Sequence, residues 1–412
     1  MGNWRSFKVV CTAITVAVFR LASASELDHQ RPGGQEATTQ DIGAYVNLEL
    51  SHGRDERGKG HDVTKPPKGA VFTSIRIGSG GEEIPAFYTS NAASDRVEHV
   101  YITLHGRRRD GGHYWRAMTE AIDSRRGKRH TVVIAPLFLS TKLNSGRYGD
   151  KQLAFADVNA WQAGCRANHP DNTRVSSLDA LDAIVDMFAD RAAYPRMRNM
   201  TVVGHGGGGQ LAQRYAAVGR EAPAHVHMRY VHGDASTSAY FTGDRPVRRE
   251  DRPVRREDRP VMRGDRPARR GACELYNTWR YGFDDFWGPK SPMEYFAQYI
   301  GRDVVSLVGL GDVEANGDQS CMARLQGGSK RRDRNLAWYK YVNALARTRE
   351  DLGGFPGDFG GVPDWSAVSN HSSRLRLAAV EDVSHNVEDI FLSDGGQSAL
   401  FSDGHVEPGW RP

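Results

Sequence analysis

The sequence predicts an α/β fold in which a mostly parallel sheet carries helices on both faces. Apolar runs of strand length alternate with stretches at helical spacing along most of the 412 residues. Hydrophobic residues make up 39% of the chain, which is enough to bury a large core. The predicted strands cover residues 70–77, 99–104, 131–135, 200–203, 226–232, 303–309 and 374–380.

The clearest helix begins at Ser177. Either Ser176 or Ser177 can cap its N-terminus, because a serine hydroxyl accepts a hydrogen bond from a first-turn amide. Its apolar residues recur at the spacing of one helical face. They are Leu178, Leu181, Val185 and Phe188.

The most informative segment is 204–208, which reads Gly-His-Gly-Gly-Gly. It lies between the predicted strand 200–203 and a helix-compatible stretch at 210–215, the context of the G-x-S-x-G nucleophile elbow of α/β-hydrolases. Position 206, where that motif has its serine, is glycine. A glycine suits the strained turn but supplies no nucleophile. A plain glycine-rich turn and a phosphate-binding loop are the alternatives, although the P-loop lysine and the G-x-G-x-x-G spacing are absent.

A second motif follows the predicted strand 99–104. His105 and Gly106 stand where the oxyanion loop of lipases and esterases has its His-Gly pair. Two backbone amides would then form the oxyanion hole, those of Arg107 and Gly207.

An acid and a base complete the pattern. Asp312 follows the predicted strand 303–309, and His385 follows the last predicted strand. The order of elbow, acid and histidine is that of the α/β-hydrolases. We therefore expect a catalytic site that lacks its serine. Ser236 and Ser238 follow the next predicted strand, 226–232. Neither stands in an elbow motif, so we do not expect either to replace the serine.

Taken together, these motifs resemble those of secreted or cell-envelope α/β-hydrolase-fold proteins of fungi, oomycetes and bacteria. The shared segments are an S-S-x-D-x-L-D helix at 176–182, a G-H-S-x-G-G-Q elbow at 204–210 and a C-x-x-x-x-Q-G segment at 321–327 followed by basic residues. The resemblance spans residues 70–400 apart from an insert. It implies the hydrolase fold, a disulfide between Cys273 and Cys321, and descent from a serine esterase. The serine of the family falls on Gly206.

The insert comprises residues 244–271, four tandem heptads based on Asp-Arg-Pro-Val-Arg-Arg-Glu. Its eleven arginines and six acidic residues account for the whole net charge of +5. A proline in every repeat forbids a continuous helix, so we expect a disordered, solvated loop. Its arginine pairs could be protease sites, nucleic-acid contacts or a nuclear address. The interleaved acids and the lack of aromatic residues argue against nucleic-acid binding.

The N-terminus predicts secretion. In residues 1–24, Arg5 and Lys8 precede an apolar segment and a small-residue cleavage site, as in a signal peptide. N-myristoylation at Gly2 is the competing interpretation. Residues 25–68 are expected to form a poorly ordered extension, and residues 69–412 the hydrolase-like domain. No later segment is long and apolar enough to span a membrane.

The four cysteines agree with an extracellular location. Cys11 would leave with the signal peptide, and Cys165, Cys273 and Cys321 would allow one disulfide at most. Glycosylation sequons begin at Asn199 and Asn370. The sequence carries no cofactor or metal signature.

Three functions fit these features. The first is a secreted pseudoenzyme that binds an ester-like ligand or a protein partner in the inherited pocket. The second is an active esterase-like enzyme, in which His385 and Asp312 activate water or a nucleophile lies elsewhere. The third is a pathogen effector or interaction protein acting through the repeat or the N-terminal tail, where residues 31–34 and 54–57 only weakly match effector motifs.

Overall fold

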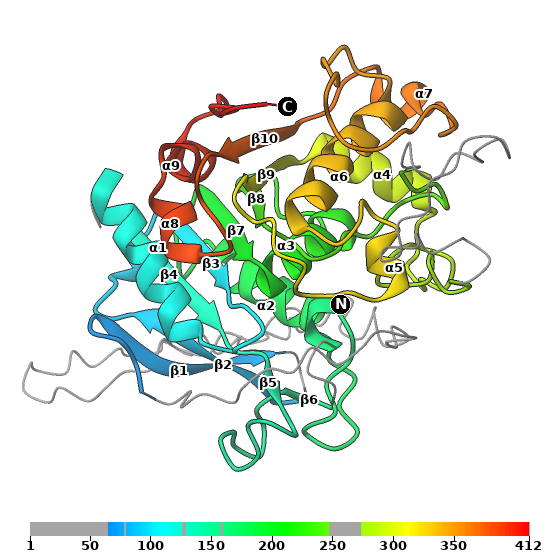
Figure 1. The fold of residues 1–412 in the computed structure, drawn as a ribbon. Coiled ribbons are helices and arrows are strands. Elements are labelled where there is room, and N and C mark those ends of the chain that lie inside the picture. Colours follow the sequence, from blue (N-terminus) through cyan, green and yellow to red (C-terminus); the bar gives the residue numbers. More distant parts are fainter. Residues whose placement is uncertain (1–64, 78–79, 126–128, 157–159, 247–272, 412) are drawn as a thin grey trace, which may run out of the picture. The chain divides into compact units, whose positions relative to one another are not determined.

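The computed structural model describes residues 65–77, 80–125, 129–156, 160–246 and 273–411. A sheet of eight strands in the order β1-β2-β4-β3-β7-β8-β9-β10 forms its centre (Figure 1). The strands are β1 (Ala70–Ile77), β2 (Glu82–Thr89), β3 (His99–Leu104), β4 (Thr131–Pro136), β7 (Asn199–His205), β8 (His227–Gly233), β9 (Asp303–Gly309) and β10 (Leu375–Val380). A separate two-stranded sheet pairs β5 (Leu139–Ser140) with β6 (Ala154–Phe155).

The sheet is parallel from β4 to β10. Only β1 with β2 and β2 with β4 pair in the antiparallel sense, whereas all later neighbours pair parallel. The carboxyl ends of β3, β7, β8, β9 and β10 therefore meet at one edge of the sheet. In open parallel sheets this edge is where ligands bind.

Each predicted strand corresponds to a strand of the structure. The short strands β5 and β6 were not predicted, and neither was the longer β2. Its sequence contains Pro85, which lacks an amide hydrogen and is normally excluded from the middle of a sheet. The structure accommodates it because the pairing of β2 with β4 begins only at Ala86. The carbonyl of Pro85 instead accepts a hydrogen bond of 2.8 Å from the Leu137 amide.

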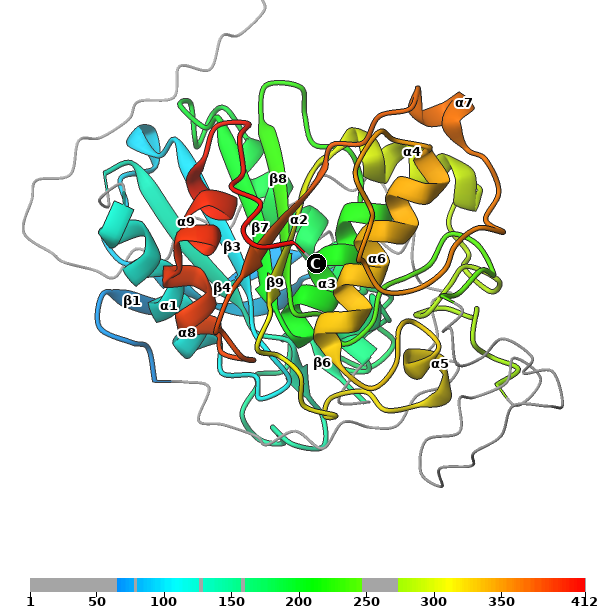
Figure 2. The ribbon, with the colours of Figure 1, turned by 45° about the horizontal axis from the view of Figure 1, so that its top comes forward.

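Helices cover both faces of the sheet (Figures 1 and 2). One face carries α1 (Gly111–Arg125), α8 (Val387–Leu392) and α9 (Asp394–Phe401), and the other carries α2 (Ser177–Ala189), α3 (Gly207–Val218), α4 (Pro292–Gly301) and α6 (Arg331–Ala346). Successive side chains of a strand point to opposite faces. Val202 accordingly belongs to the core beneath α2 and α3, and Val203 to the core beneath α1 and α8.

Several short helices complete the described fold. They are α5 (Cys321–Arg324), α7 (Ser366–Ser369) and two turns of 3₁₀ helix at Ser94–Arg96 and Ala160–Ala163. None of the helices in the described ranges is long and apolar enough to cross a bilayer.

Helix α2 shows how its local sequence sets its start. Ser176 is its N-cap and forms a capping box with Asp179. The hydroxyl of Ser176 accepts a hydrogen bond from the Asp179 amide, and the Asp179 carboxylate accepts one from the Ser176 amide. The four apolar residues predicted for this helix are all buried.

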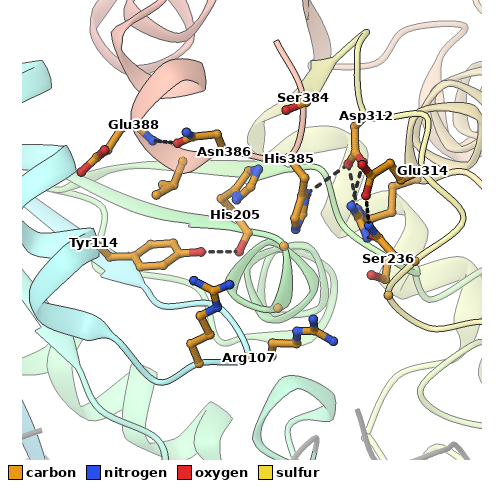
Figure 3. A pocket seen from close by; sticks show the side chains of 18 of the residues that line it. Arg107, Tyr114, His205, Ser236, Asp312, Glu314, Ser384, His385, Asn386 and Glu388 are labelled. Atoms are coloured by element: carbon orange, nitrogen blue, oxygen red, sulfur yellow. Dashed lines mark hydrogen bonds and ion pairs between the residues drawn. The ribbon is translucent and has the colours of Figure 1, made fainter. Parts of the chain in front are cut away.

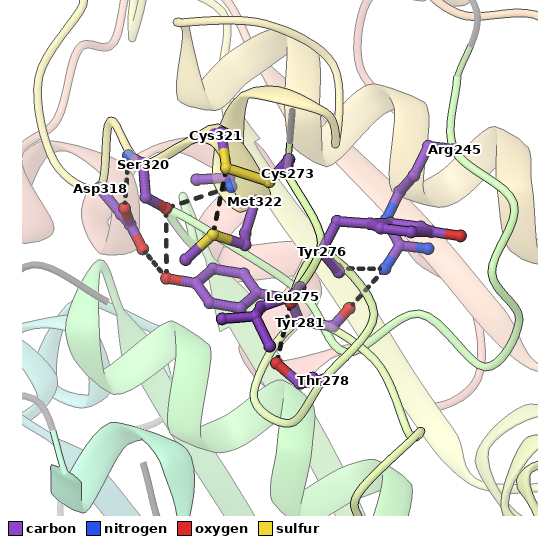
Figure 4. The surroundings of a disulfide bond; sticks show 11 residues. Arg245, Cys273, Leu275, Tyr276, Thr278, Tyr281, Asp318, Ser320, Cys321 and Met322 are labelled. Atoms are coloured by element: carbon purple, nitrogen blue, oxygen red, sulfur yellow. Dashed lines mark hydrogen bonds between the residues drawn. A yellow bond between two sulfur atoms is a disulfide. The ribbon is translucent and has the colours of Figure 1, made fainter. Parts of the chain in front are cut away.

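The described residues that flank the arginine-rich repeat on its C-terminal side include a disulfide (Figure 4). Residues 247–271 lie outside the described residues, as do the predicted signal peptide and the N-terminal extension up to residue 64. Arg245, within the first repeat, is buried and donates hydrogen bonds to the carbonyl oxygens of Tyr276 and Tyr281. Cys273, two residues beyond the repeat, is joined to Cys321. The described fold therefore includes the start of the first heptad, where a disordered loop was expected.

Candidate active site

The elbow is the sharp turn between β7 and α3. Gly206 is the N-cap of α3 and has φ 59° and ψ −114°, a left-handed conformation that residues with a Cβ rarely adopt. Its amide donates a hydrogen bond of 2.9 Å to the carbonyl of Gly233. Gly208 is required for another reason, since a Cβ there would lie 2.0 Å from the carbonyl oxygen of Leu104.

The predicted acid and base lie beside this turn. His385 Nδ1 is 3.0 Å from Asp312 Oδ2. Because an ionised carboxylate only accepts hydrogen bonds, the proton of His385 is on Nδ1, and Nε2 is left with a free lone pair. Asp312 is almost fully buried and receives two further hydrogen bonds of 2.7 Å from the guanidinium of Arg331.

These contacts set the charge states of the pair. Burial alone would raise the pKa of Asp312, but the hydrogen bonds from His385 and Arg331 bring it below its usual value. Burial lowers the pKa of His385, the neighbouring His205 lowers it further, and the bond to Asp312 only partly offsets them. At neutral pH the pair is therefore an imidazole and a carboxylate.

The free nitrogen of His385 faces the glycine. Figure 3 shows His385 on the side of the pocket where it bonds to Asp312. A Cβ built on Gly206 would lie 2.9 Å from His385 Nε2. This distance is shorter than real contacts of a Cβ. A side chain at position 206 would thus reach the imidazole, but the ring would first have to move back slightly.

The oxyanion loop also approaches the elbow. A Cβ on Gly207 would lie 3.2 Å from the backbone nitrogen of Arg107, so the two predicted oxyanion-hole residues are neighbours. Within the described residues, neither amide donates to another backbone group outside the regular helices and strands. The arrangement leaves both N–H groups available to a ligand oxygen.

Hydrogen bonds of His105 hold the oxyanion loop in position. This histidine is fully buried, and its Nε2 accepts a hydrogen bond from the Phe138 amide while Nδ1 donates to the carbonyl of Gly106. Burial lowers the pKa of His105 to about 3, so the ring is neutral at physiological pH. Its role is to position the loop.

A second histidine–carboxylate pair lies behind the first. His205 Nε2 is 3.2 Å from Asp234 Oδ2, and both side chains are buried. Asp234 directly follows β8, and its Oδ1 accepts a hydrogen bond from the Gly309 amide. The rings of His205 and His385 lie against each other with centroids 4.4 Å apart.

These groups open into a cavity of about 480 Å³. Arg107, Arg108 and Asp110 line it on the side of the oxyanion loop, and Glu314 and Glu388 line it elsewhere. The volume is that of an ordinary ligand pocket. Its lining of charged and polar groups favours a polar ligand.

The chain is similar to solved structures of known proteins. No family model matches it, and a search of the curated proteins found no match. The poly(aspartic acid) hydrolase-1 of Sphingomonas sp. KT-1 is 16% identical, with 79% of this chain and 96% of that one aligned at a TM-score of 0.51. LpqC, a poly(3-hydroxybutyrate) depolymerase from Bordetella parapertussis, is 17% identical, with 89% and 96% aligned at a TM-score of 0.51. The chain has the α/β-hydrolase fold.

Within this α/β-hydrolase fold, the structure brings together five of the predicted residues. They are Gly206, Asp312, His385, Arg107 and Gly207. Ser236 also lines the cavity, but among the described residues no hydrogen bond joins its hydroxyl to either histidine. Within the described residues, its hydroxyl therefore lacks the contact with a histidine that activates a catalytic serine.

The other predicted residues lie away from the cavity. Asn370 is exposed at the end of α7, whereas Asn199 is half-buried at the start of β7 with its amide near His99. Glycosylation at either residue stays a prediction, with Asn370 the more accessible. Cys165 is buried outside the disulfide.

Sequence reasoning assigned no role to three side chains of this α/β-hydrolase site. Arg331 occurs in the basic segment of the family resemblance, but its pairing with Asp312 depends on a fold contact across 19 residues. His205 ends β7, and Asp234 directly follows the neighbouring strand β8. The sequence could have indicated the latter pair. An acidic residue that directly follows the strand beside the elbow strand lies at the same edge of the sheet as the elbow.

Proposed function

We propose that this protein is a secreted pseudoenzyme with the α/β-hydrolase fold that binds a polar ligand or a protein partner in its former active site. The supporting observation is that position 206 presents no side chain to His385 Nε2. An acyl-enzyme needs a nucleophilic oxygen at this point. The remaining parts of the site can still hold a ligand oxygen between the amides of Arg107 and Gly207.

Secretion is supported by the disulfide between Cys273 and Cys321, because such bonds persist in oxidising compartments. An extracellular location is therefore part of the proposal. It can be tested by expressing the full chain with a C-terminal tag in a secretory host. Tagged protein in the medium, shortened at the N-terminus, is the expected result, and retention of the full-length chain in the cell would contradict it.

A fluorophosphonate probe, which labels activated serines, tests the loss of the nucleophile. The wild-type protein should remain unlabelled, and Gly206→Ser should become labelled if His385 and Asp312 still act as base and acid. Gly206→Ala is the matched control, since it adds the same Cβ without the hydroxyl. Labelling of the wild-type protein that is lost in His385→Ala would overturn the proposal.

One specific observation favours a second candidate function, direct hydrolysis by water. His385 is hydrogen-bonded to Asp312, and the backbone nitrogen of Arg107 lies close to Gly207. In a serine protease such a remnant retains about 10³–10⁴-fold catalysis over water. Turnover of p-nitrophenyl esters that disappears in His385→Ala would support this candidate. Turnover unchanged by that substitution would exclude the site as its source.

A further inference from the structure

The pair of His205 and Asp234 has no part in the proposed function. Asp234 has no solvent exposure, and burying a carboxylate is costly unless a positive charge or several hydrogen bonds compensate. Asp312 has the guanidinium of Arg331 for this purpose. Among the described residues, Asp234 pairs with no lysine or arginine, and His205 is its one ionisable partner.

His385 adds a third group at the same place. One ligand atom each from His205, Asp234 and His385 lies within 4.8 Å of the other two. In the described part of the chain, this is the group of histidine and carboxylate side chains arranged so that it could hold a metal ion. Both histidines line the cavity, so an ion and its water could enter.

The surroundings of His385 match those of a metal ligand. A metal-bound histidine usually donates its other ring hydrogen to a carboxylate, which orients the ring and strengthens the ligand. Asp312 accepts this hydrogen from Nδ1, and Nε2 faces the open side of Gly206. In an ordinary hydrolase, the serine side chain would fill that space.

We propose that His205, Asp234 and His385 form a binding site for Zn²⁺. Two imidazole nitrogens, one carboxylate oxygen and a water molecule are a donor set found in catalytic zinc sites. The ion would compensate the buried charge of Asp234 and would require loss of the proton between Asp234 and His205. This inference goes beyond the proposed function, which requires no metal.

The geometry requires only a small adjustment. Bonds of 2.0–2.1 Å place tetrahedral ligand atoms about 3.3 Å apart. His205 Nε2 and Asp234 Oδ2 are already 3.2 Å apart. The ring of His385 is 35% exposed and already lies against the ring of His205, so a small rotation would bring its Nε2 toward those two atoms. A zinc-bound water ionises near pH 7.

The test is a calorimetric titration of the full protein, freed of metal by a chelator, with ZnCl₂. We expect one ion per chain, and at least a tenfold weaker affinity in His385→Ala. Because His385 is partly exposed, this variant should remain folded. His113→Ala is the matched control, since His113 lines the same cavity, where it pairs with Glu388, outside the proposed site. Its affinity should equal that of the wild type.

Cobalt provides a readout independent of affinity. Co²⁺ in a four-coordinate site gives visible absorption, which should appear in the wild type and in His113→Ala but disappear in His385→Ala and Asp234→Asn. No saturable Zn²⁺ binding, or binding unaffected by His385→Ala, would overturn the proposal. Because fluorophosphonate labelling detects a serine rather than a metal, either proposal can fail without the other.

Discussion

Position 206 combines two constraints in one residue. The turn requires φ near 59°, and His385 lies where a Cβ would project. Glycine relieves both, because it has no Cβ to strain the backbone or to contact the ring. Glycine at position 206 therefore satisfies the backbone and the packing of the site at once.

Gly206→Ala should lower the free energy of unfolding by about 1–3 kcal/mol, the cost of a non-glycine residue in such a conformation. Chemical denaturation measures this change. Gly301→Ala is the control, since its φ is outside the left-handed region and its added Cβ would meet no atom within 4 Å. Equal stability of Gly206→Ala and wild type would show that the turn carries no strain.

The effect of Arg331 on the charge of Asp312 can also be tested by a single substitution. Its guanidinium holds Asp312 through two hydrogen bonds in a buried setting. Arg331→Met should raise the pKa of Asp312 and destabilise the fold by about 3–5 kcal/mol, because the carboxylate loses its permanent cation. NMR titration of the carboxyl carbon and denaturation measure the two effects. An unchanged pKa would mean that His385 alone sets the charge of Asp312.

At the scale of elements, the same capping box occurs in two environments. Ser176 caps the buried helix α2, and Ser291 caps the exposed start of α4 with Glu294. Removing a buried partner leaves the other group unsatisfied, whereas water replaces an exposed one. We expect Ser176→Ala to cost about 1–2 kcal/mol of unfolding free energy and Ser291→Ala about half as much. Equal losses in denaturation experiments would show that burial is irrelevant to these caps.

Elements with a regular period could be predicted from the sequence, and those set by their neighbours could not. The buried parallel strands are mostly apolar, so their predicted ranges agree with the structure to within two residues at each end. Strand β2 was missed because Pro85 is tolerated only through the late start of its pairing with β4. Residues after strands were placed correctly at the sheet edge. The contact between His205 and Asp234 was missed because it depends on the register of two strands.

At the scale of the whole molecule, buried neutral histidines couple the fold to pH. Burial lowers the pKa of both His105 and His232 to about 3, whereas a histidine of the unfolded chain titrates near 6.5. The folded state therefore binds fewer protons than the unfolded state below that pH. Stability is fully present above pH 6.5 and decreases as the pH falls toward 3.

Each of these histidines should cost about 2 kcal/mol of unfolding free energy when the pH is lowered from 7 to 5. Denaturation at a series of pH values measures the slope. In His105→Gln the amide oxygen can still accept from Phe138, so the fold should persist with a slope reduced by about 1.4 kcal/mol per pH unit. His405→Gln, at an exposed site, is the control and should leave the slope unchanged. Because both variants keep all the carboxylates, the difference between their slopes reports on His105 alone. If His105→Gln retained the wild-type slope, His105 would have to be protonated in the folded protein, and its bond from the Phe138 amide could not exist.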